Sequence, residues 1–238
     1  MNVESVKEYY TTHLNKSDDL KTNACCTRES YPKNIKNVIS SIHENIKNSY
    51  YGCGLVIPDC LENCNILDLG CGTGFDVYIL SKLVGENGTV TGVDMTEKQL
   101  KVANTWKEWH RDKFNYEKSN VTFLHGYIEL LNDLHISNNS IDVVISNCVI
   151  NLCLNKEAVL RQVYNVLKKG GEFYFSDVYS SRRISDELRK DSVLWGECLS
   201  GALYWNDFLN LVKRCGFTDP RSVTSKPITI NISVESII

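Results

Sequence analysis

The chain has 238 residues, of which 42% are hydrophobic and 23% charged, and its net charge is −3. This is an ordinary globular composition with room for one α/β domain, and it shows no basic excess that would favour nucleic acid. The first residues lack the apolar core of a secretory signal, and the longest apolar stretch, 141–154, is interrupted by polar residues. We therefore expect a cytoplasmic protein without a membrane span.

Helical spacing of apolar residues predicts two helices near the start of the chain, over 3–14 and 32–46. The second has Pro32 in its first turn, where helices tolerate proline. The polar stretch between them, 15–31, is predicted to be a loop that holds Cys25 and Cys26.

From residue 65 onward, strand-like and helix-like segments alternate. The predicted strands are 66–69, 89–94, 121–124, 141–146 and 172–179, followed by weaker candidates at 221–224 and 228–232. The predicted helices are 75–84, 97–113, 156–168 (stopped by Gly170 and Gly171) and 203–215. This alternation predicts an α/β fold, a Rossmann-like, mostly parallel, doubly wound sheet with helices on both faces.

A glycine-rich turn follows the first predicted strand, with Gly70, Gly72 and Gly74 just after Asp68. Such a turn lets the backbone approach a ligand closely, although a plain tight turn would have the same glycines. The spacing G-x-G-x-G differs from the dinucleotide pattern G-x-G-x-x-G. Asp68 suits the ammonium group of a sulfonium amino acid, directly or through water, better than it suits a pyrophosphate.

Two further sites agree with a nucleoside cofactor. Asp94 ends the second predicted strand, where its carboxylate can accept hydrogen bonds from both ribose hydroxyls. Ile128 and Glu129 follow the third strand, where an adenine ring would be enclosed, although Glu129 can equally be a solvated charge.

The chain contains ten cysteines but no paired C-x-x-C spacing, so a structural zinc site is not expected. Without a secretory signal, reduced thiols are the default, either as small buried side chains or as soft ligands. The histidines at 43, 110 and 135 stand in polar contexts, and none is placed as a general base.

Several segments together resemble the arsenite methyltransferase family, over about residues 9–230. They are YYGCGL (50–55), VDMT (93–96), HGYIE (125–129), SNCVINL (146–152), FSDVY (175–179) and WGECL (195–199). The SNCVINL and WGECL segments are specific to this family, whereas the glycine turn is shared by many methyltransferases.

The resemblance implies a class I methyltransferase fold and four functional cysteines. Cys148 and Cys198 would bind trivalent arsenic, while Cys25 and Cys53 would deliver it or help to hold it, with Cys53 as a third ligand; Cys26 could substitute for Cys25. The cofactor would be S-adenosylmethionine, with Tyr51, Gly70, Met95 and Asn147 as further contacts. The substrate would be arsenite or its glutathione complex, and glutathione or a thioredoxin-type reductant would act as partner.

The resemblance also implies an organisation of the chain. Residues 1–50 would form a helical segment with an arsenic-delivery loop, 51–180 the cofactor-binding core, and 181–238 an arsenic-binding region that ends the sheet. Family members continue beyond this point, so the chain would be C-terminally shortened, with weak turnover and a tendency to self-associate. The alternatives are a cofactor- or arsenic-binding remnant without activity, or another small-molecule methyltransferase.

Overall fold

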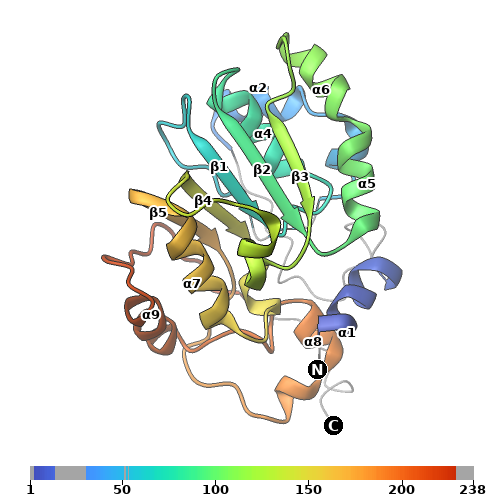
Figure 1. Ribbon diagram of the computed structural model, residues 1–238. Coiled ribbons are helices and arrows are strands. Elements are labelled where there is room, and N and C mark those ends of the chain that lie inside the picture. Colours follow the sequence, from blue (N-terminus) through green and yellow to red (C-terminus); the bar gives the residue numbers. More distant parts are fainter. Residues whose placement is uncertain (1–2, 14–30, 51, 53, 229–238) are drawn as a thin grey trace.

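The computed structural model describes residues 3–13, 31–50, 52 and 54–228. Its centre is a parallel sheet of five strands in the order β3-β2-β1-β4-β5 (Figure 1). The strands are β1 (Asn65–Leu69), β2 (Thr89–Asp94), β3 (Val121–His125), β4 (Ile141–Asn147) and β5 (Leu167–Ser176). The predicted Rossmann-like α/β sheet is confirmed, and β5 forms one edge of it among the described strands.

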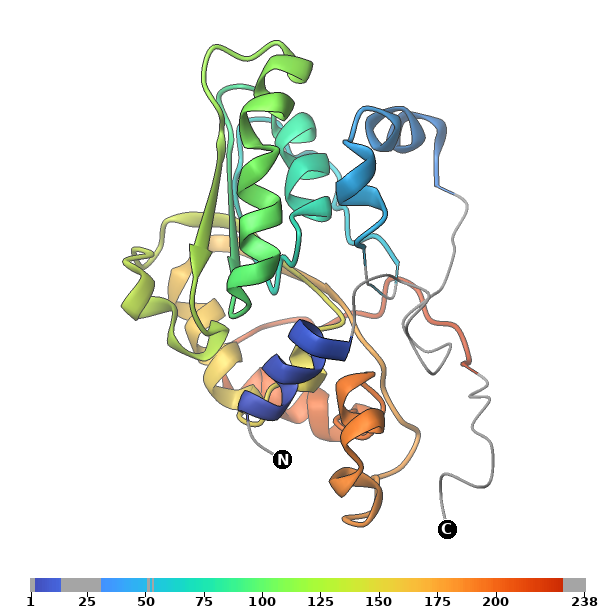
Figure 2. The same cartoon turned by 90° about the vertical axis from the view of Figure 1, so that its right-hand side faces the viewer.

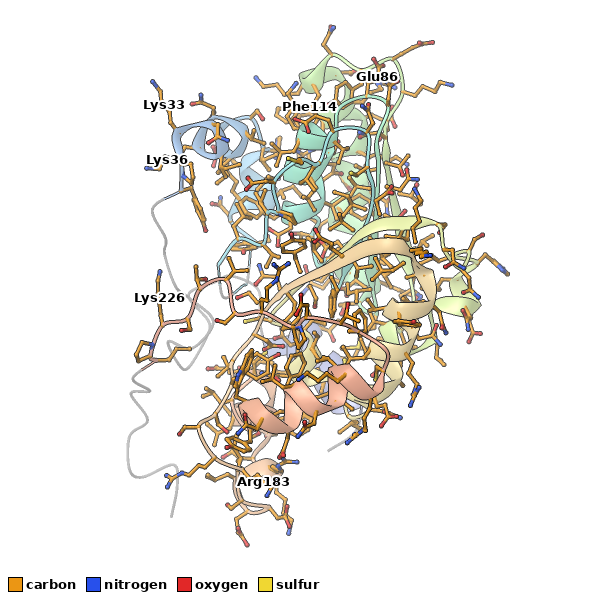
Figure 3. The ribbon with its side chains drawn as sticks, turned by 90° about the vertical axis from the view of Figure 1, so that its left-hand side faces the viewer. Lys33, Lys36, Glu86, Phe114, Arg183 and Lys226 are labelled. Carbon is orange, nitrogen blue, oxygen red and sulfur yellow. The ribbon has the colours of Figure 1, made fainter. Side chains whose placement is uncertain are left out.

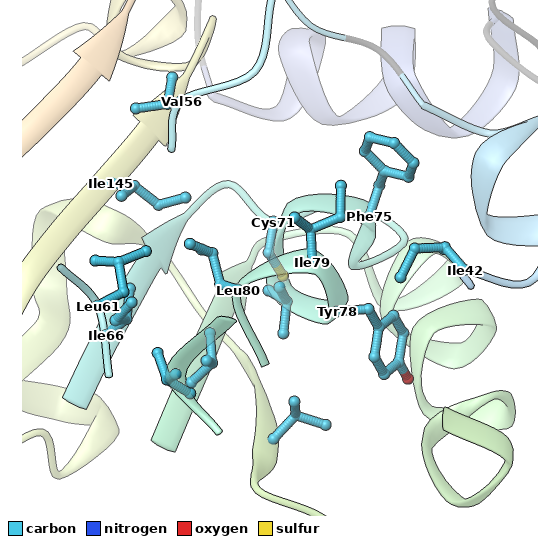
Figure 4. Close-up of a cluster of buried hydrophobic side chains, with 14 of the residues drawn as sticks. Ile42, Val56, Leu61, Ile66, Cys71, Phe75, Tyr78, Ile79, Leu80 and Ile145 are labelled. Atoms are coloured by element: carbon cyan, nitrogen blue, oxygen red, sulfur yellow. The ribbon is translucent and has the colours of Figure 1, made fainter. Parts of the chain in front are cut away.

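Helices cover both faces of this sheet (Figure 2). One face carries α4 (Phe75–Val84), α5 (Glu97–Thr105) and α6 (Lys107–Phe114), with α2 (Lys33–Ser40) and α3 (Glu44–Lys47) outside them. The other carries the 3-10 segment η3 (Ile128–Leu134) and α7 (Lys156–Val166), against which α9 (Trp205–Arg214) packs. Successive residues of β1 serve the two faces, since Ile66 joins the cluster under α4 (Figure 4), whereas Leu67 and Leu69 join the cluster under α7.

The start of the chain packs against a segment nearly two hundred residues later. The helix α1 (Val3–Glu8) continues into a π-helical turn, η1 (Tyr9–His13), and lies beside α8 (Ser192–Gly196) (Figure 1). The Tyr9 hydroxyl donates to Glu197 Oε1 at 2.9 Å, and the Tyr10 hydroxyl donates to the Gly196 carbonyl at 3.0 Å. The first predicted helix is therefore docked on the region that carries Cys198.

Two predicted helices are each broken into two, and the breaks meet in space. The helix expected over 32–46 stops at Ser40 and restarts at Glu44, where His43 Nδ1 accepts a hydrogen bond from the Asn45 amide. The helix expected over 97–113 is interrupted at Trp106, whose backbone is not helical. The rings of His43 and Trp106 stack with centroids 3.3 Å apart. The two interruptions are therefore in contact with each other.

The prediction for residues 156–179 was wrong in its boundaries. The helix α7 ends at Val166 and β5 begins at once, pairing Leu167 with Ile141 before the register shifts and pairs Glu172 with Val143. The two glycines at 170 and 171 therefore lie in this irregular part of the strand and do not stop the helix. The strand ends at Ser176 rather than Tyr179, and its continuation leads through two short helical segments, η5 (Leu188–Lys190) and α8, towards α9.

The weaker strand candidates have separate outcomes. Residues 221–224 are described and form no strand, whereas 229–232 lie outside the described residues. Charged side chains such as Lys33, Lys36 and Arg183 project away from the body of the molecule (Figure 3). Among the described residues, no helix has both the length and the apolar character that crossing a membrane requires.

Candidate active site

The glycine turn after β1 has the geometry that its sequence predicted. The amides of Gly70 and Cys71 both donate to the Val93 carbonyl, at 2.8 and 3.0 Å, and this ties the turn to the end of β2. Gly70 has a φ of +73°, and a Cβ built there would lie 2.4 Å from Val149 Cγ2. Only glycine therefore fits at position 70 without displacing the segment that follows β4.

The strain and the crowding at Gly70 can be separated by a matched pair of variants. Gly85 also has a left-handed backbone, with a φ of +78°, but a Cβ there would meet nothing within 4 Å. We expect Gly70→Ala to lower the free energy of unfolding by about 1–3 kcal/mol more than Gly85→Ala, because only the former overpacks its surroundings. Urea unfolding of both variants measures this difference, and equal losses would show that Val149 moves aside freely.

Asp94 closes the turn from the side of β2. Its Oδ2 accepts the Gly72 amide at 2.9 Å, and its Oδ1 accepts the Thr96 amide at 2.8 Å. Burial raises the pKa of this carboxyl, while the two amide hydrogen bonds oppose the rise. The Thr96 hydroxyl also donates to this carboxylate, whose roughly four acceptor sites leave room for a hydrogen bond from a ligand hydroxyl.

Asp94→Ala is expected to weaken S-adenosylmethionine binding by roughly 1.5–3 kcal/mol, the value of hydrogen bonds to a charged acceptor. Asp142→Ala is the control, because Asp142 also accepts a backbone amide, that of Asn65, but near the opposite ends of the strands. Calorimetric titration should show a loss of affinity in the first variant alone. Unchanged affinity of Asp94→Ala would remove Asp94 from the cofactor site.

One cavity at the carboxyl ends of the strands gathers most of the residues predicted to contact the cofactor. Those lining it are Gly70, Gly72, Asp94, Met95, Ile128, Glu129 and Asn147, together with Cys148. Gly74 is not part of this lining, and its Cβ position faces Phe123 and Ala103, which indicates a packing role. Tyr51 lies outside the described residues. We expect this cavity to take the nucleoside cofactor, and the individual contacts remain predictions.

Asp68 lies behind the cavity wall in a buried polar cluster that the sequence did not reveal. Asn147 Nδ2 donates to Asp76 Oδ2 at 3.0 Å, to the Tyr50 hydroxyl at 2.7 Å and to the Gly54 carbonyl at 2.5 Å. Asp68 and Asp76 are almost fully buried, and burial raises the pKa of both carboxyls, with further repulsion from Asp76 on Asp68. The sequence feature that could have indicated this cluster is Asp76, an acidic residue in the first turn of the otherwise mostly apolar helix α4.

Cys148 and Cys198 are brought together from positions fifty residues apart in the chain. Cys148 follows β4, Cys198 follows α8, and both have left-handed backbones, with φ values of 57° and 63°. Both residues are buried, and Cys198 Sγ donates to the Cys148 carbonyl at 3.0 Å. The Sγ atoms of both cysteines and a carboxylate oxygen of Asp177 lie within 4.8 Å of one another. The two cysteines predicted to hold arsenic thus share one site beside this cavity.

The remaining cysteines are less informative. Cys25, Cys26 and Cys53 lie outside the described residues. Cys148 is disulfide-bonded. Cysteines 71, 153 and 215 are buried, Cys60 is exposed, and Cys64 is half-buried.

The polar context predicted for His110 was wrong. Its ring is almost fully buried and stacks on Tyr78 with centroids 3.7 Å apart, and burial lowers its pKa to about 4. No histidine occurs among the described residues that line the cavity.

Sequence reasoning missed several lining residues. Val6 and Tyr10 reach the cavity from the first helix, where their spacing indicated an apolar face but not its target. Gln99 lies in the helix after β2, and nothing in its local sequence distinguished it. Asn151 and Asp177, beside the thiols, belong to segments that were noted only for their resemblance to the family.

Known proteins with similar sequences or structures agree on one family. The model of a methyltransferase domain matches residues 61–216. The arsenite methyltransferase of Aquipseudomonas alcaligenes is 54% identical over 97% of this chain and 66% of its own length, and that of Homo sapiens is 52% identical over 99% and 63%. The crystal structure of an arsenic(III) S-adenosylmethionine methyltransferase from Chlamydomonas reinhardtii has a TM-score of 0.82 and 47% identity, over 86% of this chain and 68% of that one.

A parallel sheet of this order, with a glycine turn after β1 and an acid at the end of β2, is common to nucleotide-binding α/β folds, and the match to the family model identifies it here as a methyltransferase domain. Within this class, the chain belongs to the arsenite methyltransferase family. It spans slightly less than two thirds of the length of the curated relatives it matches.

Proposed function

We propose that this chain transfers a methyl group from S-adenosylmethionine to trivalent arsenic held by cysteine thiolates, in the cytoplasm. One observation carries the proposal: Cys148 lines the cofactor cavity and lies beside Cys198. A thiol pair in this position can present a soft atom directly to a cofactor's methyl group. Related proteins named arsenite methyltransferase support arsenic as that atom.

The residues of the cavity suit this cofactor. The glycine turn offers a close backbone approach, Asp94 offers an oriented acceptor pair, and the buried carboxyls of Asp68 and Asp76 lie behind the wall. Buried acids with raised pKa values favour a cationic ligand, because a positive charge stabilises their ionised form. S-adenosylmethionine supplies a methyl group on a positively charged sulfur, which is activated for transfer to a nucleophile.

Trivalent arsenic needs no general base in this reaction. Bound by thiolate sulfur, it retains a lone pair, and the arsenic–carbon bond forms as the bond between the methyl carbon and sulfur breaks. No proton leaves the nucleophile, which agrees with a lining without histidine among the described residues. The work of the protein is to position the two reactants and exclude water.

A reductant belongs to the proposed cycle for two reasons. Methylation converts arsenic formally from the trivalent to the pentavalent state, and two electrons must restore the nucleophile for another transfer. The disulfide at Cys148 must also be reduced before its thiolate can bind arsenic. Glutathione or a thioredoxin-type protein would serve. Residues 51–180 would form the catalytic core in this scheme, with 1–50 and 181–238 contributing the other cysteines.

The direct test incubates the purified chain with arsenite, glutathione and S-adenosylmethionine and separates the arsenic species formed. Methylated arsenic that depends on both protein and cofactor is the expected result. Arsenite that is retained by the protein without methylated product would instead identify a binding protein and refute the catalytic proposal.

A further inference from the structure

The carboxylate of Asp177 lies beside Cys148 and Cys198. The proposed methyl transfer does not require this carboxylate. Asp177 follows β5, and one of its oxygens lies within 4.8 Å of both Cys148 Sγ and Cys198 Sγ. Trivalent arsenic prefers sulfur and can complete its coordination with further thiolates. The carboxylate therefore needs a separate explanation.

The backbone holds this carboxylate in place. Asp177 Oδ2 accepts the Asn151 amide at 2.9 Å, and Oδ1 accepts the Val178 amide at 2.9 Å. The Ile150 amide is a third backbone partner of this carboxylate, whose roughly four acceptor sites leave room for one further partner. Asn151 Nδ2 also donates to the carbonyls of Val178 and Cys198, at 2.6 and 3.3 Å, which links the carboxylate segment to the second thiol.

We propose that Cys148, Asp177 and Cys198 form a binding site for a thiophilic divalent cation of the zinc group once the disulfide at Cys148 is reduced, with two thiolates and one carboxylate as ligands. The proposal shares two ligands with the proposed arsenic site, so cation and arsenite would exclude each other. The fourth position of a tetrahedral ion would remain open to water, as in zinc sites with three protein ligands.

The separation of the ligand atoms suits such an ion. For three atoms that all lie within 4.8 Å of one another, some point is no more than about 2.8 Å from each, whereas zinc binds sulfur at about 2.3 Å and carboxylate oxygen at about 2.0–2.2 Å. Small side-chain rotations therefore close the site. Magnesium and calcium prefer several oxygen ligands and should not compete.

The charges around the site favour a divalent ion. Two thiolates and a carboxylate carry three negative charges, and the buried Lys156 interacts electrostatically with Asp177 and Cys198. Its Nζ donates to the carbonyls of Asn151 and Cys153, at 3.2 and 2.8 Å, which fixes one positive charge beside the ligands. Arg189 also interacts electrostatically with Lys156, and a divalent cation would compensate the negative charge that remains at the ligands.

Cobalt(II) is the probe, because its thiolate complexes absorb strongly and report the number of sulfur ligands. The full chain is reduced with a phosphine, freed of excess reductant and titrated with cobalt(II), without arsenic or cofactor. We expect a saturable thiolate-to-cobalt band with tetrahedral d–d bands, displaced by zinc and by arsenite but not by magnesium. Since neither reactant of the methylation is present, failure here would leave the proposed function standing.

Three variants assign the ligands. Cys198→Ser should remove about half of the thiolate band, and Asp177→Asn should weaken cobalt affinity about tenfold or more at unchanged shape. The double variant Cys60→Ser/Cys64→Ser alters the more accessible thiols and should bind like the parent. S-adenosylmethionine binding serves as the check that each variant is folded.

Three results would overturn the proposal: no saturable band in the parent chain, equal affinity in folded Asp177→Asn, or loss of the band in the Cys60/Cys64 variant alone. Should Asp177→Asn fail to fold, a full band in Cys198→Ser would by itself refute the site.

Discussion

Cys198→Ser is expected to reduce arsenic methylation below detection while leaving S-adenosylmethionine binding intact. Cys198 is completely buried beside Cys148, at the end of a different segment from the cofactor turn. A serine hydroxyl occupies similar space, but oxygen is a poor ligand for soft trivalent arsenic. The substitution should therefore remove the substrate and not the cavity. Arsenic speciation after incubation with arsenite, reductant and cofactor measures the first effect, and calorimetry measures the second.

The matched control for this variant is Cys215→Ser. Cys215 is also a buried cysteine, but it packs with α9 in a separate cluster that includes Phe208 and Val212. It should lose some stability, since a hydroxyl replaces a buried thiol, yet it should retain methylation. If Cys198→Ser methylates arsenite at the rate of the parent chain, Cys198 is not an arsenic ligand.

The sheet and its cofactor turn were predictable from sequence because their signals are local. A glycine triplet between a buried strand and a helix, and an acid at the end of the next strand, depend on residues close together in the chain. The topology of a parallel sheet then places Cys148, directly after β4, at the edge where ligands bind. These inferences needed no knowledge of distant contacts.

The features that sequence reasoning missed depend on residues far apart in the chain. The breaks at His43 and Trp106 coincide with a ring stack between positions more than sixty residues apart. The assignment of Cys198 rested on resemblance alone. The connection from β5 to α8 is irregular, so no hydrophobic periodicity in the sequence predicts that this segment packs beside Cys148. Asp177 could not be predicted either, because only the folded chain brings it close to Cys148 and Cys198.

Asp76→Asn is expected to stabilise the cofactor-free protein at neutral and alkaline pH. Burial raises the pKa of Asp76 above its ordinary value, so the folded state keeps a proton that the unfolded state releases. Stability then falls as pH rises above about 4, by up to about 1.4 kcal/mol per pH unit, until the pH passes the folded-state pKa. Asparagine has no such proton and can still accept the hydrogen bond from Asn147.

Urea unfolding at several pH values between about 4 and 8 measures how the free energy of unfolding depends on pH. The dependence should be steeper for the parent chain than for Asp76→Asn. Asp142→Asn is a control of opposite sign. Partial burial raises the pKa of Asp142, but hydrogen bonds from Lys168 and the Asn65 amide outweigh it and leave the pKa lowered. Asp142 therefore stabilises the fold above the ordinary carboxyl pKa, and its loss should destabilise at neutral pH. Parallel stability curves for Asp76→Asn and the parent would show that Asp76 ionises normally.

The same Asp76 substitution should weaken cofactor binding although it stabilises the fold. One oxygen of Asp76 is buried without a hydrogen-bond partner among the described residues, and the other is held by Asn147, which lines the cavity. A negative charge on Asp76 favours a positively charged ligand in the cavity that Asn147 lines. S-adenosylmethionine carries a sulfonium charge that S-adenosylhomocysteine lacks, and both carry the same ammonium group. We therefore expect Asp76→Asn to lower the ratio of their affinities, which calorimetry with both ligands measures. An unchanged ratio would mean that Asp76 only orients Asn147 and does not act on the charge that is lost when the methyl group leaves.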